Sequence, residues 1–377
     1  MGGIAGLIHF RGAPPDRGQA ARMSEAVAHR GPDDSGTWAE GPAILTQRRM
    51  RLSESGRRQP IAANPLTLVL DGRIYDLGAL RNALDREGVT PRTTGDADAV
   101  LAAWGLWGPD TLDRIQGDFS LAVWDRRERV LWLARDPMGV KPLYFSHQGG
   151  RFAFASDLRA LLGLPWVSRE LATEELAEYL SFRYCHAPRT LLRQVQQLPA
   201  GHLARVDAHG LRLHRFWRPQ WCAPDAEELD EDAVRDGLER LLDRSTEKRL
   251  VADQPVGILL SGGLGSAAIL QVASRRERRR TINLSFSDGG MDEASFAGRV
   301  AGLYGAEHET LRISREDFVE ALPSVVEAAG QPLPSPAAVI QFLAARFARE
   351  QGLRILLSGD GGDELMGGRR VARLVRE

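Results

Sequence analysis

Short apolar runs separated by Gly, Pro and Asp dominate the first 206 residues of the chain. Such runs predict β-strands, and they lie at 4–9, 43–46, 66–70, 120–125, 130–135, 143–146 and 152–155. Three longer segments, at 19–28, 77–87 and 97–107, place apolar residues at helical spacing. Many short strands interrupted by a few helices predict stacked antiparallel sheets with helices on their outer faces, which is an α+β domain.

The pattern changes after the proline- and acid-containing stretch 219–230, which predicts a linker. Apolar residues at helical spacing follow between 234 and 242, and the continuous apolar run 256–260 is typical of a buried parallel strand. Beyond it we expect helices at 267–273, 292–304 and 337–350 and strands at 281–286 and 354–357. This βα alternation predicts part of a doubly wound α/β domain, so we expect two domains, at 1–218 and 231–377.

Charge and composition exclude several classes of function. The chain has 49 basic and 50 acidic residues, so nothing points to a nucleic-acid or membrane partner. The basic run 275–280 is expected to be a solvated helix end. No apolar stretch approaches the roughly 18 residues that span a bilayer, and the N-terminus does not resemble a signal peptide. We therefore expect a cytoplasmic protein in which Cys185 and Cys222, which lack metal-ligand spacing, are reduced thiols.

A glycine-rich segment, Ser261-Gly262-Gly263-Leu264-Gly265-Ser266, lies between a predicted strand and a predicted helix. Glycines there let the backbone approach a ligand closely, so that successive N–H groups can surround a phosphate, and the two serine hydroxyls add donors. The alternative is a tight turn that binds nothing.

A second segment, Ser358-Gly359-Asp360-Gly361-Gly362-Asp363-Glu364, follows another predicted strand. Because ligands bind at the carboxyl ends of strands in open α/β sheets, we expect it to lie near the first segment. Its acids could equally cap the next helix, and capping is compatible with catalysis.

Motifs along nearly the whole chain resemble the asparagine synthetase family, in which a class II glutamine amidotransferase domain precedes an ATP-pyrophosphatase domain. They are Gly3-Ile-Ala-Gly6, His29-Arg-Gly-Pro-Asp33, Arg51-Leu-Ser53, Asp71-Gly-Arg-Ile-Tyr75, Gly117-Asp-Phe-Ser-Leu-Ala122, Ala134-Arg-Asp-Pro-Met-Gly-Val-Lys-Pro-Leu-Tyr144, Phe154-Ala-Ser156, Leu198-Pro-Ala-Gly-His202, and the two glycine-rich segments. The resemblance implies the four-layer sandwich of N-terminal nucleophile hydrolases, followed by a partial domain like the adenine nucleotide α-hydrolases. It also implies ATP-dependent amide formation through an acyl adenylate.

The resemblance implies a glutamine pocket that has lost its chemistry. The family's nucleophilic cysteine corresponds to Gly2, and its oxyanion-binding asparagine corresponds to Asp71. A carboxylate cannot donate a hydrogen bond, which removes a stabilisation of about 3 kcal/mol. Arg51 for the α-carboxylate, Asp96 for the α-amine and Gly72 for the oxyanion are retained. We expect no glutamine hydrolysis, and structural roles for His29 and Arg30.

In the second domain the resemblance implies an ATP site with magnesium. The nucleotide-binding positions would be Leu260, Ser261, Gly262, Gly263, Gly265, Ser266, Leu284, Ser358 and Gly359. Gly265 stands where the family has a magnesium-binding aspartate, so Asp363 would be the remaining ligand. Asp360 would lie near the reacting carboxyl group.

The family continues beyond the position of Glu377, so we expect a truncated chain or a separate polypeptide that supplies the C-terminal region. A homodimer is the other partner considered. The predicted activity is an asparagine synthetase-like ligase acting on a small-molecule or peptide carboxylate. Loss of the cysteine resembles lasso-peptide cyclases and β-lactam synthetases, which use an amine already present in the substrate. A pseudoenzyme that binds a nucleotide or a partner without turnover stays open.

Overall fold

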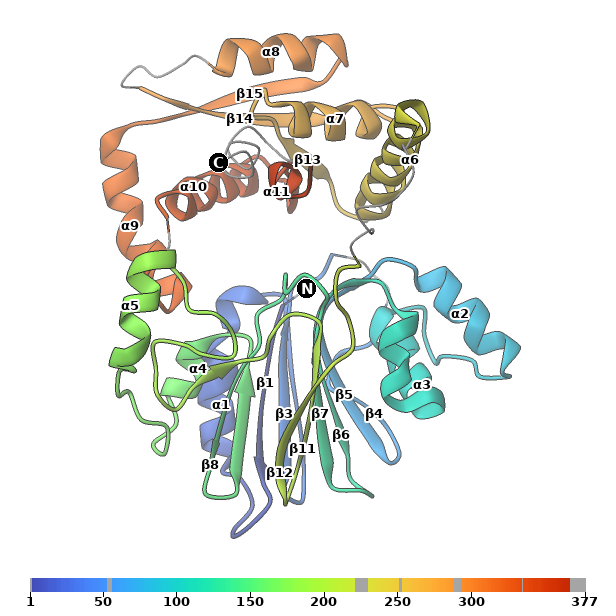
Figure 1. Cartoon of the computed structure of the whole chain (residues 1–377), viewed down its shortest axis with the longest axis vertical. Helices are drawn as coiled ribbons and strands as arrows, with labels where there is room; N and C mark the ends of the chain where they lie inside the picture. The colour runs from blue at the N-terminus through green and yellow to red at the C-terminus, as the bar shows by residue number, and fades with distance from the viewer. Residues whose placement is uncertain are drawn as a thin grey trace. The chain divides into compact units, whose positions relative to one another are not determined.

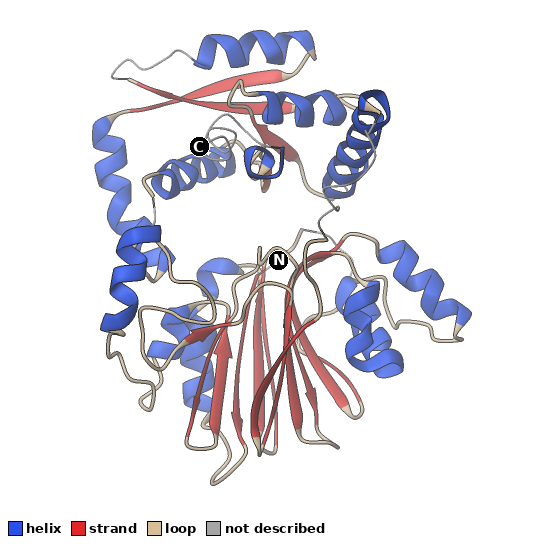
Figure 2. Cartoon of the chain, viewed as in Figure 1, coloured by secondary structure: helices blue, strands red, loops and turns tan. Residues whose placement is uncertain are grey.

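The structure is a computed structural model that describes residues 2–52, 56–220, 230–250, 253–287, 293–333 and 335–366 (Figures 1 and 2). Contacts divide the chain into two units: Met1–Trp221 with Gly330–Pro334, and Cys222–Ala329 with Ser335–Glu377. Most of the expected linker, at 221–229, lies outside the described residues. No helix among the described residues is long and apolar enough to span a bilayer.

Two antiparallel six-stranded sheets form the first unit. The first sheet consists, in spatial order, of β10 (Gln196–Gln197), β8 (Tyr144–Gln148), β9 (Arg151–Ala155), β1 (Gly2–His9), β3 (Ala43–Arg49) and β2 (Asp34–Glu40). The second consists of β12 (Gly210–Arg215), β11 (His202–Asp207), β7 (Val130–Arg135), β6 (Gly117–Asp125), β5 (Leu66–Ile74) and β4 (Ile61–Ala63).

The two sheets pack face to face. Side chains from both, including Ile4 and Phe154 of the first sheet and Val69 and Leu133 of the second, form one buried cluster. The outer face of the first sheet buries α1 (Arg17–Ala26) and α4 (Leu158–Leu162), and that of the second buries α2 (Leu77–Arg86) and α3 (Asp96–Trp107) (Figure 1). The expected four-layer αββα sandwich is therefore confirmed. The remaining helical elements are η1 (Ala28–Arg30), η2 (Gly108–Arg114) and α5 (Thr173–Phe182).

The second unit is built on a parallel sheet. Its strands, in spatial order, are β15 (Glu307–Ile313), β14 (Arg280–Phe286), β13 (Val256–Leu259) and β16 (Ile355–Leu357). Its helices are α6 (Glu231–Leu250), α7 (Leu264–Ala273), α8 (Glu293–Leu303), α9 (Arg315–Ala329), α10 (Ala337–Glu350) and α11 (Gly362–Met366). The expected partial α/β domain is thus present, with β15 and α9 as additional elements.

Helix α7 begins at Leu264, three residues before the predicted start at 267. Gly263 has the extended conformation of an N-cap residue, so Gly265 and Ser266 belong to the first turn of the helix and not to the loop. The prediction placed the start too late because the glycine-rich sequence does not favour a helix.

Strand β13 lies where the order of the sheet reverses. The chain runs from β13 to β14 and β15 on one side, and later returns to pair β16 with the other side of β13. At such a reversal the connections leave the carboxyl ends of the two strands in opposite directions, which opens a crevice for ligands. Both glycine-rich segments follow this pair of strands.

Candidate functional site

The loop after β13 presents main-chain donors. Gly262 has a φ of +82°, a conformation that favours glycine. Gly263 caps α7 without a side-chain hydrogen bond, so the N–H groups of the first helical turn receive no side-chain acceptor from their cap residue. Leu264 and Gly265 are exposed in this turn. Free N–H groups at the positive end of a helix dipole favour an anion such as phosphate.

Ser266 and Ser261 hold this loop together. Ser266 is 4% exposed, and its Oγ accepts a hydrogen bond from Ser261 N at 3.2 Å and donates to Gly263 O at 3.1 Å. Ser261 Oγ lies 3.1 Å from Ser266 Oγ and accepts from Gly263 N at 3.3 Å. The Ser266 hydroxyl was expected to face a phosphate, but here it is turned inward and supports the loop. Ser261 is exposed and keeps the expected placement.

The turn after β16 touches the first turn of α7. A methyl group added to Gly359 would lie 2.8 Å from Ser266 N and 3.0 Å from Gly265 C, which is closer than real contacts allow. Only glycine fits there, so the two glycine-rich segments meet backbone to backbone, as the sequence predicts. Beside this contact, Ser358 Oγ donates to Asp360 Oδ2 at 2.9 Å.

The acidic residues of the site are few. Asp360 and Asp363 are both exposed, and the described residues contain no cluster of three His, Cys, Asp or Glu side chains that could hold a metal. Magnesium is commonly bound by one or two carboxylates together with substrate phosphates, so Asp363 fits such an ion only in company with a phosphate. A methyl group on Gly265 would lie 3.6 Å from Gly359 O, which leaves room for a side chain.

The two leucines expected to border the nucleotide differ in exposure. Leu260 is fully buried and packs with Leu270 and Ala297 in the core of the unit. Its side chain is therefore not available to a ligand, which corrects the expectation from the sequence, although its peptide group leads into the loop. Leu284 is half-buried on β14.

In the first unit, Gly2 and Asp71 come together as expected, but in a closed arrangement. Gly2 N donates to Asp71 Oδ1 at 2.6 Å, and Arg30 Nε donates to Gly2 O at 3.2 Å. Arg30 Nη2 lies 3.7 Å from Asp71 Oδ2, and the Asp71 side chain is fully buried. The pairing of Arg30 with Asp71 was not predicted from the sequence. A carboxylate on a buried strand was the available signal, because it needs a cation nearby.

Gly2, which was expected to stand in place of a nucleophile, has no room for a side chain. A methyl group on Gly2 would lie 1.9 Å from Arg48 O of the neighbouring strand β3. Gly72 has a φ of +144°, and a methyl group on it would lie 2.0 Å from Asp118 O. A side chain at position 2 would therefore require β1 and β3 to move apart.

The other two residues of the expected glutamine pocket, Arg51 and Asp96, each have their own bonding partners. Arg51 is largely exposed; its Nη2 lies 4.0 Å from Asp34 Oδ2, and its backbone N donates to Asp33 Oδ2 at 2.8 Å. Asp96, at the start of α3, accepts a hydrogen bond from Ile74 N at 3.0 Å. Burial raises the pKa of the Asp96 carboxyl, and the bond from Ile74 N opposes that rise.

His29 belongs to a separate ion-pair cluster. Its Nε2 lies 3.3 Å from Asp157 Oδ2, and Arg159 Nη2 lies 2.8 Å from the same oxygen. Burial lowers the pKa of His29, while the Asp157 charge raises it. Asp157 also accepts from Arg159 N and caps α4, so the surroundings of His29 fit the structural role expected for it.

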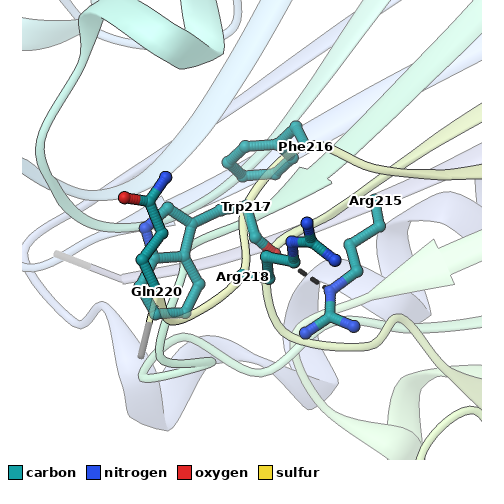
Figure 3. A pocket seen from close by; sticks show the side chains of 5 residues that line it. All are labelled: Arg215, Phe216, Trp217, Arg218 and Gln220. Atoms are coloured by element: carbon teal, nitrogen blue, oxygen red, sulfur yellow. Dashed lines mark hydrogen bonds between the residues drawn. The ribbon is translucent and has the colours of Figure 1, made fainter. Parts of the chain in front are cut away.

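A surface hollow of about 790 Å³ lies beside the end of β12 (Figure 3). The described residues that line it are Arg215, Phe216, Trp217, Arg218 and Gln220. Arg215 Nε donates to Trp217 O at 3.1 Å. None of these residues belongs to the sites expected from the sequence, and the described part of the lining comes from one short segment.

Comparison with known proteins identifies two families along the chain. Residues 1–217 match the model of a glutamine amidotransferase domain, and residues 237–376 match that of asparagine synthase. A Mycobacterium tuberculosis protein provisionally named as a glutamine-hydrolysing asparagine synthetase is 35% identical over 98% of this chain and 61% of its own length. Asparagine synthetase 1 of Bacillus subtilis is 29% identical over 93% of this chain and 56% of its own.

Both alignments therefore span roughly three fifths of the relative's length. Among solved structures, a glutamine phosphoribosylpyrophosphate amidotransferase of B. subtilis has a TM-score of 0.43 and 16% identity, over 94% of this chain and 71% of that one. The matches to both family models, in the order amidotransferase then synthase, show that the chain belongs to the asparagine synthetase family.

Proposed function

We propose that this protein is an ATP-dependent amide ligase that does not hydrolyse glutamine. The main support for ligase activity is the contact between the two glycine-rich segments at the carboxyl ends of β13 and β16. Family membership supports the same chemistry. The closed arrangement of Gly2, Asp71 and Arg30 supports the loss of glutaminase activity.

In the proposed reaction a substrate carboxylate oxygen attacks the α-phosphorus of ATP. The bond from that phosphorus to the bridging oxygen breaks, and pyrophosphate leaves with the electron pair. A nitrogen nucleophile then attacks the acyl carbon, loses a proton and displaces AMP. The first-turn N–H groups of α7 and the Ser261 hydroxyl would bind the phosphates, and Asp363 would hold magnesium against them.

The nitrogen donor is proposed to be an amine on the substrate. Without a cysteine at position 2 this unit has no nucleophile there to release ammonia from glutamine. An intramolecular reaction, as in lasso-peptide cyclases or β-lactam synthetases, needs no such release. The acceptor would then be a peptide or small molecule that carries both a carboxylate and an amine.

A catalytically inactive protein that binds nucleotide is the second candidate. It is favoured by Gly265, which supplies no carboxylate. ATP–pyrophosphate exchange separates the two candidates. Exchange that depends on a carboxylate supports the ligase, whereas magnesium-dependent ATP binding without exchange against a panel of amino-acid and peptide carboxylates supports the inactive protein. Absence of ATP and pyrophosphate binding would contradict both.

A further inference from the structure

A buried asparagine side chain bonds the backbone at the point where the phosphate loop begins. Asn283 lies on β14, one residue before Leu284, and is 1% exposed. Its Nδ2 donates to Leu260 O at 2.8 Å. Leu260 follows the last residue of β13, so this carbonyl belongs to the peptide group from which the loop departs.

The same peptide group is held on its other side by Ser266. The N–H of the Leu260–Ser261 peptide donates to Ser266 Oγ at 3.2 Å, while its carbonyl accepts from Asn283. Leu260 N also continues the ladder to Ile282 O at 2.8 Å. Two buried side chains therefore bond the opposite edges of one peptide plane, and rotation of that plane would break both bonds.

The Asn283 amide is only half satisfied. Its Oδ1 is buried and has no hydrogen-bond partner among the described residues. A buried acceptor without a partner is costly, and such groups in folded proteins call for an explanation. Leucine has nearly the same shape and would bury no polar atom. The benefit of asparagine at this position is therefore the bond that its amide makes to Leu260 O.

We propose that Asn283 is a positioning residue that fixes the first peptide plane of the phosphate loop and thereby sets the affinity for the phosphates of ATP. This inference rests on the proposed function for the identity of the ligand. With the plane fixed, the following N–H groups are oriented before the ligand arrives. Without it, binding must also order the loop, which weakens affinity.

The chain offers a matched control on the same strand. Thr281 lies two residues earlier on the same face of β14 and is also 1% exposed. Its Oγ1 donates to Glu307 O at 3.1 Å and lies 2.8 Å from His308 Nδ1. Thr281→Val removes both of these contacts without touching the loop. Asn283→Leu removes the one that holds the loop. A purely structural role for Asn283 would make the two variants alike.

The test measures the binding of pyrophosphate, of ATP and of adenosine to the full chain by calorimetry, with magnesium present, together with thermal unfolding. We expect both variants to lower the unfolding temperature. Only Asn283→Leu should weaken pyrophosphate and ATP binding, by about five- to tenfold, which corresponds to one hydrogen bond. Adenosine, which has no phosphate, should bind both variants as it binds the unmodified chain.

Equal pyrophosphate affinity of Asn283→Leu and the unmodified chain would overturn the inference and leave the proposed function intact. An equal loss in Thr281→Val would also overturn it. If the unmodified chain binds neither pyrophosphate nor ATP, the proposed function itself fails. Amide hydrogen exchange at Gly262 and Gly263 provides a readout without ligand, since it should quicken in Asn283→Leu and not in Thr281→Val. Should Asn283→Leu not fold, Asn283→Ala, which removes the donor without adding charge, takes its place.

Discussion

Asp71 shows how one atom exchanged for another changes what a pocket can do. An oxygen in place of an amide nitrogen turns a donor into an acceptor, and here that acceptor takes the N–H of Gly2 and faces Arg30. That Asp71 in its ionised form cannot donate to an oxyanion could be predicted from its residue type alone. The close approach of β3 to Gly2 could not, because it depends on where Arg48 O lies in a neighbouring strand.

Restoring the nucleophile alone should not restore the activity. We expect Gly2→Cys to release no glutamate from glutamine above background, because Asp71 still repels an oxyanion. Its Cβ also collides with Arg48 O, so the free energy of unfolding should fall by about 1 to 3 kcal/mol. Glutamate release and chemical denaturation measure the two effects. Activity of this single variant would contradict the assignment of Asp71 as an obstacle.

Asp96 should make stability depend on pH. Its pKa is raised in the folded state, so ionising this carboxyl costs more free energy in the folded protein than in the unfolded one. The free energy of unfolding should therefore fall as pH rises from the unfolded value of 3.8 through the raised native value. Asp96→Asn keeps an acceptor for Ile74 N and cannot ionise. It should match the wild type at low pH and be more stable at neutral pH.

Denaturation of both proteins over this pH range is the measurement. If the wild type has a larger free energy of unfolding than Asp96→Asn at neutral pH, the charge on Asp96 stabilises the folded protein. The prediction that burial makes this charge unfavourable would then be wrong.

At the scale of elements, three of the missed strands share a cause. Strands β2, β12 and β15 occupy edges of their sheets, where they bury little, so they carry no apolar run for the sequence to reveal. The interior strands β1, β5, β6 and β13 were predicted, because burial on both faces selects apolar residues. Strand β11 is interior and was still missed.

The contact between the turn after β16 and the first turn of α7 should tolerate no side chain. Gly359→Ala places a methyl group 2.8 Å from Ser266 N, which should separate the two segments and weaken ATP binding at least tenfold. Gly362→Ala is the control, since a methyl group there meets nothing within 4 Å and Gly362 already belongs to a helix. Titration with ATP measures the affinity of both variants. If Gly359→Ala binds ATP as tightly as Gly362→Ala does, this contact is not needed for binding.

Gly265 offers the opposite case, a glycine with space beside it. Gly265→Asp should fit, since its Cβ would lie 3.6 Å from Gly359 O, and it adds a hard oxygen ligand to the first turn of α7. We expect tighter pyrophosphate binding in the presence of magnesium and no gain in its absence. Gly265→Ala, which adds bulk without charge, is the control. A gain that persists without magnesium would mean that the new carboxylate does not act through the metal.

At the scale of the whole molecule, the change of pattern near 219–230 predicted an α+β domain followed by an α/β domain, and both architectures are present. Among the described residues, the hydrophobic clusters of the sandwich contain residues of the first unit, and those of the parallel sheet contain residues of the second. A ligand that binds one unit should therefore stabilise that unit.

We expect pyrophosphate with magnesium to protect the second unit selectively. At a concentration 100 times its dissociation constant, a ligand stabilises the folded form by about 2.7 kcal/mol. Hydrogen exchange should slow in peptides from 253–287 and 335–366, and should stay unchanged in those from 56–220. Protection of the first unit of similar size would place the phosphate site elsewhere.

The buried trio of Gly2, Asp71 and Arg30 also limits the evolutionary paths open to this protein. A return of cysteine at position 2 first meets the carbonyl of Arg48, while a return of asparagine at position 71 first strips Arg30 of its anion. We expect either substitution alone to lower stability without giving glutaminase activity. A working glutaminase pocket would therefore need both substitutions together.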